Sequence, residues 1–339
     1  MQSRKTSADL WHQKPYYSLD AWCKNTYGRK LYKAALDIGC TCPNVPLNAG
    51  FTCPNRDGTL DTRGCIFCSA GGSGDFAASR QLSVTDQLNQ AKALLSSKWT
   101  PEPGKPSLIA YFQAYTNTYG DPDRLLSCYE EALSSPEVAG ISIATRPDCL
   151  SDIILEGLDR LQLLYPDRFI WIELGLQSIH DHTAARIRRG YPTSVFYDAA
   201  AKLHARRLPF IVHLILGLPG ETRLDLLESI RAVNQVHPFG VKLQLLHILK
   251  GTDLALLYEA GKLPVLTQEE YLDLLTSCIA ALSPDICLHR VTGDGPRKLL
   301  IAPQWSLSKR NVLNGLHALM KQRNLRQGDN YEPGTSYTL

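Results

Sequence analysis

Three cysteines in the first quarter of the chain have a spacing that can bind a metal cluster. Cys53, Cys65 and Cys68 follow the pattern C-x11-C-x2-C. Thiolate is a soft ligand that selects iron–sulfur clusters or zinc over hard cations. Three thiolates can hold a [4Fe–4S] cluster and leave one iron open to another molecule. The spacing therefore predicts a metal centre that takes part in chemistry.

Two alternatives remain open at this motif. Cys40 and Cys42 could supply the fourth ligand of a zinc site, and the chain would then be a zinc- or iron–sulfur-stabilised nucleic-acid-binding module without catalysis. Cys42 is also a rival first ligand, because Thr-Cys-Pro-Asn occurs at 41–44 and again at 52–55. We expect Cys53 to be the ligand, since only its copy continues into Arg-Asp-Gly and then reaches the CxxC motif.

The remaining cysteines predict packing rather than chemistry. They are scattered through helix-like and strand-like stretches, where a free cysteine behaves as a small buried hydrophobe. They are Cys23, Cys128, Cys149, Cys278 and Cys287.

The sequence also indicates a compartment. Residues 1–30 are polar and basic, without the apolar core of a signal peptide. No apolar run approaches the length that a membrane-spanning helix needs. We therefore expect a cytoplasmic protein without a membrane segment, in which clustered cysteines favour metal binding or catalysis over disulfides.

Basic residues gather at both ends of the chain. Residues 1–33 contain seven Lys/Arg against two Asp/Glu, residues 34–296 contain 22 against 29, and residues 297–339 contain seven against two. Basic segments of this kind can follow a phosphate backbone, although an ordinary solvated surface has a similar composition.

Strand-like apolar runs alternate with amphipathic helical stretches along the rest of the chain. Strands are predicted at 108–112, 140–144, 170–176, 211–216 and 241–248, with a first strand near 31–36 or 47–51. Helices are predicted at 83–97, 122–134, 151–164, 194–207, 221–236 and 267–282.

This alternation predicts an α/β protein with a parallel sheet. Six units fit a partial (β/α)6 barrel of the TIM type better than a closed barrel, and a doubly wound sheet is the alternative. We expect residues 34–290 to form the barrel, with a basic N-terminal extension over 1–33 and a basic helical C-terminal extension over 291–339. Polar residues gather at the carboxyl ends of the strands, which predicts the site at that edge.

The motifs CPNRDG, GCIFC, FQAYTNTY, SIATRPD, ELGLQS, RRGY, HLILGLPGET and KLQLLHILKGT follow one another in this order. This series resembles the radical S-adenosylmethionine (SAM) superfamily, in particular a bacterial subfamily related to the radical SAM domain of the Elongator catalytic subunit. The resemblance implies a partial barrel that binds a [4Fe–4S] cluster and SAM. It also implies reductive cleavage of SAM to methionine and a 5′-deoxyadenosyl radical.

The resemblance assigns the cluster to Cys53, Cys65 and Cys68, with the amino and carboxylate groups of SAM on the open iron. It places Phe67 and Gly217 beside the adenine.

Four further SAM contacts follow from the resemblance, and one residue is an alternative to the last of them. Gln113 would lie at the strand end that meets the SAM amino group, although Gln113 and Ala114 replace the usual glycines. Glu173 and Gln177 would face the ribose and methionine region. Arg189 would pair with the SAM carboxylate, and Arg146 is the other arginine that could hold it.

The C-terminal segment and the resemblance bear on the identity of the substrate. Residues 297–328 contain no acidic residue, and apolar residues recur there at helical spacing, which predicts a helix with one basic face. The radical domain of the Elongator subunit, which the chain resembles, acts at the wobble uridine of tRNA. The resemblance and the basic helix face together favour a tRNA substrate. An electron donor such as flavodoxin or ferredoxin is also implied. A peptide or small metabolite is the alternative substrate.

Overall fold

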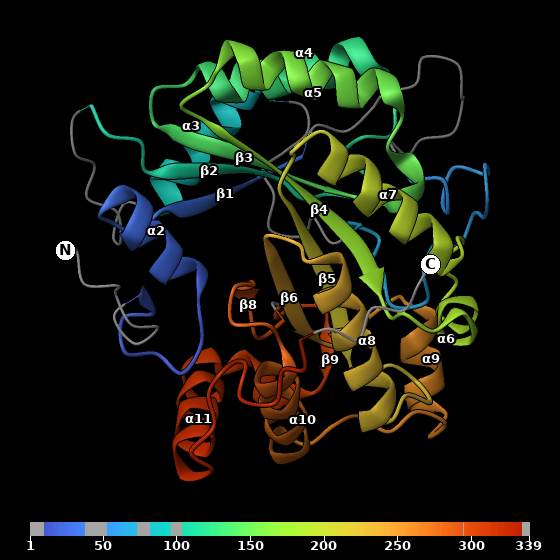
Figure 1. Cartoon of the computed structure of the whole chain (residues 1–339). Coiled ribbons are helices and arrows are strands. Elements are labelled where there is room, and N and C mark those ends of the chain that lie inside the picture. The colour runs from blue at the N-terminus through green and yellow to red at the C-terminus, as the bar shows by residue number, and fades with distance from the viewer. Residues whose placement is uncertain (1–9, 38–52, 73–81, 96–103, 294, 334–339) are drawn as a thin grey trace, which may run out of the picture. The chain divides into compact units, whose positions relative to one another are not determined.

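The computed structural model describes residues 10–37, 53–72, 82–95, 104–293 and 295–333, in which strands and helices alternate (Figure 1). The rival ligands Cys40 and Cys42, and the alternative first strand at 47–51, lie outside these residues. The strands are β1 (Tyr32–Leu36), β2 (Leu108–Phe112), β3 (Val138–Thr145), β4 (Phe169–Gln177), β5 (Phe210–Leu216), β6 (Gly240–Leu245), β7 (Ile248–Leu249), β8 (Cys287–Arg290) and β9 (Leu300–Ala302).

The helices lie mostly between successive strands. They are α2 (Leu19–Tyr27), α3 (Val84–Leu95), α4 (Pro122–Ser134), α5 (Asp152–Leu164), α6 (Asp181–Arg186), α7 (Thr193–Ala205), α8 (Arg223–Val236), α9 (Asp253–Glu259), α10 (Gln268–Ala281) and α11 (Lys309–Gln322), with short 3₁₀ turns η1 (Pro147–Cys149) and η2 (Gln304–Leu307). None of the helices in the described residues is long and apolar enough to cross a membrane.

Seven strands form one sheet in the order β1-β2-β3-β4-β5-β6-β8. The pairs β1–β2, β2–β3, β3–β4, β5–β6 and β6–β8 are all parallel, and helices connect most successive strands. This is the topology of a partial (β/α) barrel, so the predicted fold class is confirmed. The sheet has one strand more than predicted, because β8 follows α10.

The chain divides into two compact units. We call Leu31–Gly175 with Arg189–Phe210 the cysteine unit, and Met1–Lys30, Leu176–Arg188 and Ile211–Leu339 the terminal unit. These units are defined by packing and do not test the predicted division at residues 33 and 290.

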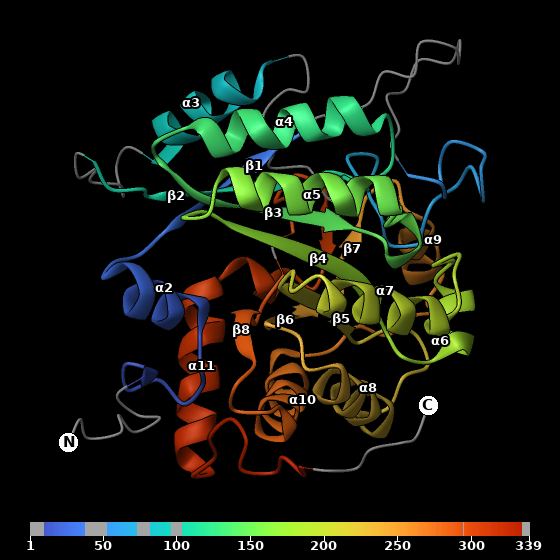
Figure 2. The same ribbon diagram turned by 45° about the horizontal axis from the view of Figure 1, so that its top comes forward.

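In the cysteine unit, helices cover a sheet whose inner strands are buried. Every residue of β2 and β3 is buried, as expected for parallel strands with both faces covered. Helices α3, α4 and α5 lie over one face of β1, β2 and β3 in both views (Figures 1 and 2). Asp121 caps α4 with Pro122 at its first position, and Ser151 caps α5.

In the terminal unit, α10 packs beside α8 and α11. Thr222 starts α8 and Thr267 starts α10, each through a capping box with the acidic residue three positions later. Helix α11 buries Val312, Leu316 and Met320 and leaves a polar face, as its apolar spacing predicts.

Both basic ends of the described chain belong to the terminal unit and contact each other. The Tyr16 hydroxyl lies 3.2 Å from Nε2 of His317 on α11. The backbone N–H of Tyr17 donates to Oε1 of Gln327 at 2.9 Å, and the Gln327 N–H donates to the Pro15 carbonyl at 2.9 Å. The two extensions therefore form one packed region rather than two separate arms.

The cysteine prediction is partly wrong. Cys23, Cys278 and Cys287 are buried as expected, whereas Cys128 and Cys149 are partly exposed. Cys128 lies on α4 at the border between its buried and exposed faces, and Cys149 ends the 3₁₀ turn after β3.

Candidate functional site

The cysteine loop (residues 53–72) is closed by backbone hydrogen bonds and by one arginine. The backbone N–H of Arg56 donates to the Cys53 carbonyl at 2.8 Å, and that of Cys68 donates to the Cys65 carbonyl at 3.0 Å. The Arg56 guanidinium in turn donates from Nη2 to the Cys68 carbonyl at 2.7 Å. Arg56 therefore ties the turn of the first predicted ligand to the turn of the other two.

Gly64 makes room for this arginine. Its φ of 75° is in the left-handed region, and a Cβ at this position would lie 2.7 Å from Nε of Arg56. Glycine meets both demands at no steric cost. The Arg-Asp-Gly continuation, by which the sequence distinguishes Cys53 from Cys42, thus contains the side chain that closes the loop.

The Cys65 thiol is buried beside the other two cysteines of the loop. Burial raises the pKa of Cys65 to about 12, and the neighbouring Cys68 and Cys53 add to the rise. The Cys65 sulfur also accepts a hydrogen bond from Nδ2 of Asn55 at 3.6 Å. Metal binding replaces thiol protons. Three thiols on one loop, with a donor directed at a sulfur, fit the ligand set of a [4Fe–4S] cluster.

Arg189 is built into the turn that follows α6. It is 2% exposed. Its Nε and Nη2 donate to the Tyr191 carbonyl at 3.1 and 3.0 Å, and Nη2 also donates to the Thr193 hydroxyl at 2.9 Å. Its guanidinium lies 4.5 Å from the centre of the Tyr191 ring. The Arg189 guanidinium is therefore held in a fixed orientation by its own turn.

The carbonyl of Arg189 joins this turn to the cysteine loop. It accepts hydrogen bonds from Nδ2 of Asn55 at 3.1 Å and from Nη1 of Arg146 at 2.9 Å. Gly190 has a φ of 83°, and a Cβ there would lie 2.4 Å from Oδ1 of Asn55. The predicted arginines and the cysteine loop thus lie together within the cysteine unit.

A carboxylate orients Arg146. Asp148 binds it at both oxygens, with Nε–Oδ1 at 2.9 Å and Nη2–Oδ2 at 2.7 Å. The guanidinium lies 5.0 Å from the centre of the Tyr191 ring and interacts electrostatically with Cys53 and Cys149. Arg146 therefore supplies a fixed positive charge beside the thiols.

The loop after β2 packs on the end of the cysteine loop. Gln113 is partly buried, and its N–H donates to the Leu36 carbonyl at 3.2 Å. Tyr115 has a φ of 58° and donates its backbone N–H to the Gly72 carbonyl at 2.8 Å. Phe67, inside the CxxC turn, is partly exposed. The structure thus brings Gln113 and Phe67 into one unit, and their contacts with SAM stay predictions.

Glu173 forms a buried ion pair. It is 0% exposed, and its Oε1 accepts from Nζ of Lys33 at 2.7 Å and from the Ser142 hydroxyl at 2.6 Å. Lys33 also lies 4.4 Å from the centre of the Tyr111 ring. Glu173 thereby ties β4 to β1 and β3, and its predicted ribose contact stays a prediction.

The predicted residues Gln177 and Gly217 belong to the terminal unit. Gln177 ends β4 and Gly217 directly follows β5, and both are in the left-handed region, with φ of 63° and 88°. Near them, the Ser178 hydroxyl donates to the Glu221 carboxylate. Burial raises the pKa of Glu221, and the hydrogen bond from Ser178 opposes that rise. These bonds hold the start of α8, and the roles of Gln177 and Gly217 toward SAM stay predictions.

His180, Asp225 and Glu228 form a second cluster of potential ligands. Within the described residues, their ligand atoms lie within 4.8 Å of one another. However, the His180 Nε2 faces the Asp225 carbonyl at 3.0 Å and so donates rather than coordinates. The Asp225 carboxylate accepts from the Thr222 N–H at 2.7 Å. We assign this cluster to the start of α8.

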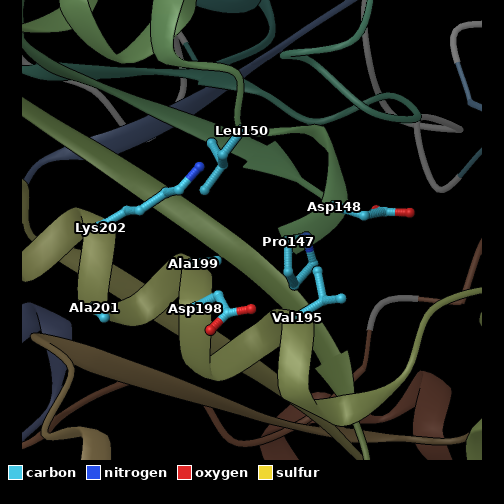
Figure 3. A pocket seen from close by; sticks show the side chains of 8 residues that line it. All are labelled: Pro147, Asp148, Leu150, Val195, Asp198, Ala199, Ala201 and Lys202. Atoms are coloured by element: carbon cyan, nitrogen blue, oxygen red, sulfur yellow. The ribbon is translucent and has the colours of Figure 1, made fainter.

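A pocket of about 440 Å³ lies between η1 and α7 in the cysteine unit (Figure 3). Asp148, which orients Arg146, forms part of its wall, but none of the predicted cofactor or metal residues lines it. Its lining comprises Pro147, Asp148, Leu150, Val195, Asp198, Ala199, Ala201 and Lys202.

Sequence reasoning missed the residues that connect the site. Asn55 and Arg56 lie inside the CPNRDG motif, so the sequence did contain them. Their roles were missed because Asn55 bonds to a residue distant in the chain and Arg56 bonds to a backbone carbonyl. Tyr191 follows the predicted arginine directly in the RRGY motif. Its carbonyl and ring both contact Arg189.

The chain matches two family models, and several relatives match it over most of its length. The model described as the Radical SAM superfamily matches residues 62–233, and the Radical_SAM C-terminal domain matches residues 238–322. The uncharacterized protein YtqA of Bacillus subtilis is 39% identical over 316 residues, which cover 93% of this chain and 92% of YtqA. Protein YhcC of Escherichia coli is 35% identical over 282 residues, covering 82% and 84%.

Elongator complex protein 3 is a more distant match. The human protein is 25% identical over 169 residues, which cover 48% of this chain and 29% of that protein. The structure of Elp3 from the archaeon Methanocaldococcus infernus superposes with a TM-score of 0.60 at 16% identity, covering 88% of this chain and 65% of that one. This structural likeness shows a shared fold.

The superfamily model matches half of the chain, and the partial barrel agrees with it. The chain belongs to the radical SAM superfamily, whose enzymes use a [4Fe–4S] cluster to cleave SAM reductively.

Proposed function

We propose that this enzyme binds its cluster through Cys53, Cys65 and Cys68 and modifies a base of tRNA, the wobble uridine. The single observation that supports the cluster assignment is the cysteine loop. It presents three thiols within one hydrogen-bonded loop and is joined through Asn55 to the turn of Arg189.

The chain's own residues would bind and orient the reactants. When bound, the cluster supplies the electron that divides SAM into methionine and the 5′-deoxyadenosyl radical. Arg56 holds the two ligand turns together. A SAM carboxylate would meet Arg189 or Arg146, both of which are nearly buried and already oriented. A preoriented guanidinium binds a carboxylate with little loss of side-chain entropy.

Anaerobic reconstitution tests the cluster. The wild-type protein should bind four irons per chain, the content of one [4Fe–4S] cluster, and release 5′-deoxyadenosine from SAM in the presence of a strong reductant. Cys53→Ala, Cys65→Ala and Cys68→Ala should each abolish both properties.

Two controls accompany these variants. Cys128→Ala removes a partly exposed thiol from α4 and should retain the cluster, as should Cys42→Ala. Stoichiometric zinc without iron would instead support the nucleic-acid-binding module. A cluster that depended on Cys42 and not on Cys53 would show that the other copy of the repeat supplies the first ligand.

The tRNA assignment is supported by the exposed cations of the terminal unit. Arg297, Lys298, Lys309, Arg310 and Lys321 are exposed on α11 and the segment before it. Arg323 is also exposed, and it is engaged with Asp273 at 2.5 Å. A surface of this kind can neutralise successive phosphates, so that counterions are released on binding.

Charge reversal tests this surface. Lys309→Glu, Arg310→Glu and Lys321→Glu together should weaken tRNA binding and flatten its dependence on salt, while SAM cleavage remains. The matched control reverses three exposed cations of the cysteine unit, Lys105, Arg124 and Arg160. Equal losses of tRNA affinity in both triple variants would show that the effect depends on net charge and not on this surface.

Nucleoside analysis tests the substrate itself. In tRNA from a deletion strain, one wobble-uridine modification should be lost or truncated, and the wild-type gene should restore it. An unchanged nucleoside profile, with no salt-sensitive tRNA binding, would favour a peptide or a small metabolite. The electron donor, a flavodoxin or ferredoxin, is identified by its ability to replace the chemical reductant in the SAM cleavage assay.

A further inference from the structure

The Asn55 side chain bonds both to a predicted cluster ligand and to the turn of Arg189. It is 1% exposed. Its Nδ2 lies 3.6 Å from the Cys65 sulfur and 3.1 Å from the Arg189 carbonyl. Residues 55 and 189 are 134 positions apart, so the fold has brought them together.

The chemistry of these two partners fixes the orientation of the amide. A carboxamide nitrogen carries two hydrogens, and its oxygen carries none. A carbonyl and a sulfur ligand both accept hydrogen bonds, so both must face the nitrogen. One N–H of Asn55 is therefore directed at the Arg189 carbonyl and the other at Cys65. The oxygen faces Gly190, where a Cβ would lie 2.4 Å away.

The backbone on both sides holds the amide in place. The Gly64 N–H donates to the Asn55 carbonyl at 2.8 Å, which fixes the Asn55 backbone next to the CxxC turn. The Arg189 carbonyl is fixed in turn by Nη1 of Arg146 at 2.9 Å. The distance between the amide and the sulfur is therefore set by the fold on both sides.

A donor directed at a cluster sulfur changes the redox properties of the cluster. Reduction adds negative charge to the cluster, and a nearby N–H dipole stabilises that charge. We propose that Asn55 is a positioning residue that raises the reduction potential of the cluster through its N–H bond to Cys65. The inference rests on the proposed ligation by Cys53, Cys65 and Cys68, and it concerns how readily the cluster takes up an electron.

The test is the midpoint potential of the reconstituted cluster, measured by electron paramagnetic resonance during a redox titration. Asn55→Leu keeps a similar volume without a donor, and Asn55→Asp keeps the shape with acceptors in place of the N–H groups. Both should shift the potential to more negative values, and a smaller fraction of the cluster should be reduced at a fixed reductant concentration.

Asn117 offers a matched control. It is 3% exposed, and its Nδ2 donates to the carbonyls of Phe112 and Ala144 at 3.0 and 2.9 Å. Asn117→Leu removes two amide-to-carbonyl hydrogen bonds but none to a sulfur. The cluster of this variant should therefore retain the wild-type reduction potential.

The remaining outcomes separate the two proposals. Loaded Asn55 variants with the wild-type potential would overturn the inference and leave the proposed function intact. Loss of the cluster from both variants would also overturn it, since Asn55 would then hold the loop rather than adjust the potential. A wild-type protein without a [4Fe–4S] cluster would overturn both proposals.

Discussion

Arg189, which we propose as a partner of the SAM carboxylate, is held in place by bonds to both its side chain and its backbone. Its guanidinium bonds to Tyr191 and Thr193 within its own turn, and its carbonyl receives Asn55 and Arg146. A residue held this firmly loses little entropy when it binds a carboxylate. Replacing it therefore affects ligand binding more than an exposed arginine would.

Arg189→Ala should weaken SAM binding by about 1.5–3 kcal/mol, the range for a hydrogen bond to a charged group. Isothermal titration of the reconstituted protein measures this loss. Arg188→Ala is the control, because the neighbouring Arg188 pairs with Asp253 at 2.5 Å in the terminal unit and should leave SAM affinity unchanged. Unchanged affinity in Arg189→Ala would assign the carboxylate to Arg146.

His247 should make stability depend on pH. It follows β6 and its Nε2 lies 3.1 Å from the Ser306 hydroxyl. Burial, together with Arg290 and Lys309, lowers the pKa of His247 from 6.5 to about 4. Above pH 6.5 the imidazole is neutral in both folded and unfolded chains. Between pH 6.5 and about 4 only the unfolded chain takes up the proton, so stability falls across this window.

The loss at His247 should be on the order of 3 kcal/mol. Urea unfolding at a series of pH values measures it in the wild type and in His247→Asn. The variant should lose less stability than the wild type between pH 6.5 and 4. Parallel profiles for the two proteins would show that other groups cause the acid sensitivity.

At the scale of elements, helix starts were among the predictable features. Thr222 and Thr267 each precede an amphipathic run and have an acidic residue three positions later, and both form capping boxes. Thr222→Ala and Thr267→Ala should each lower the free energy of unfolding by about 1 kcal/mol. Ser308→Ala is the control, because the Ser308 side chain makes no capping bond to α11. Denaturant unfolding of the three variants checks these values.

The predicted strands reflect continuous apolar runs, which parallel strands buried on both faces require. Strand β8 was missed because Cys287–Arg290 has only four residues, two of them buried. The predicted strand at 241–248 is divided, since β6 ends at Leu245 and Ile248 pairs with Ala302 instead. That pairing depends on a contact distant in the sequence.

The same limit applies to the candidate site. Cysteine spacing predicts the thiols because all three lie within 16 residues of one another. The bonds of Asn55 and Arg146 to the Arg189 carbonyl span 134 and 43 positions. No local pattern encodes such a pair, because the tertiary fold alone decides which carbonyl faces the amide.

At the scale of the whole molecule, Gln327 connects the two basic ends of the chain. It is 3% exposed. Besides its bonds to Pro15 and Tyr17, its Nε2 donates to the carbonyls of Ser283 and Ile286 at 2.6 and 2.8 Å. One side chain thus joins the N-terminal segment, the segment after α11 and the turn before β8.

Gln327→Ala should lower the free energy of unfolding by about 1–3 kcal/mol, because buried backbone groups lose their partners. Limited proteolysis should then cut the segment around Tyr16 faster than in the wild type. Gln322→Ala, at the exposed end of α11, is the control and should change neither property. If the Gln327 variant resisted both denaturant and protease as the wild type does, the two ends would be held by their apolar contacts instead.

The ion pair of Lys33 and Glu173 sets an order of events during synthesis. The two residues are 140 positions apart, so a ribosome adds Glu173 on the order of ten seconds after Lys33. A carboxylate cannot be buried cheaply without its cation. We therefore expect Glu173 to take its buried position on β4 only together with β1, so that the first and fourth strands of the cysteine unit are buried in one late step.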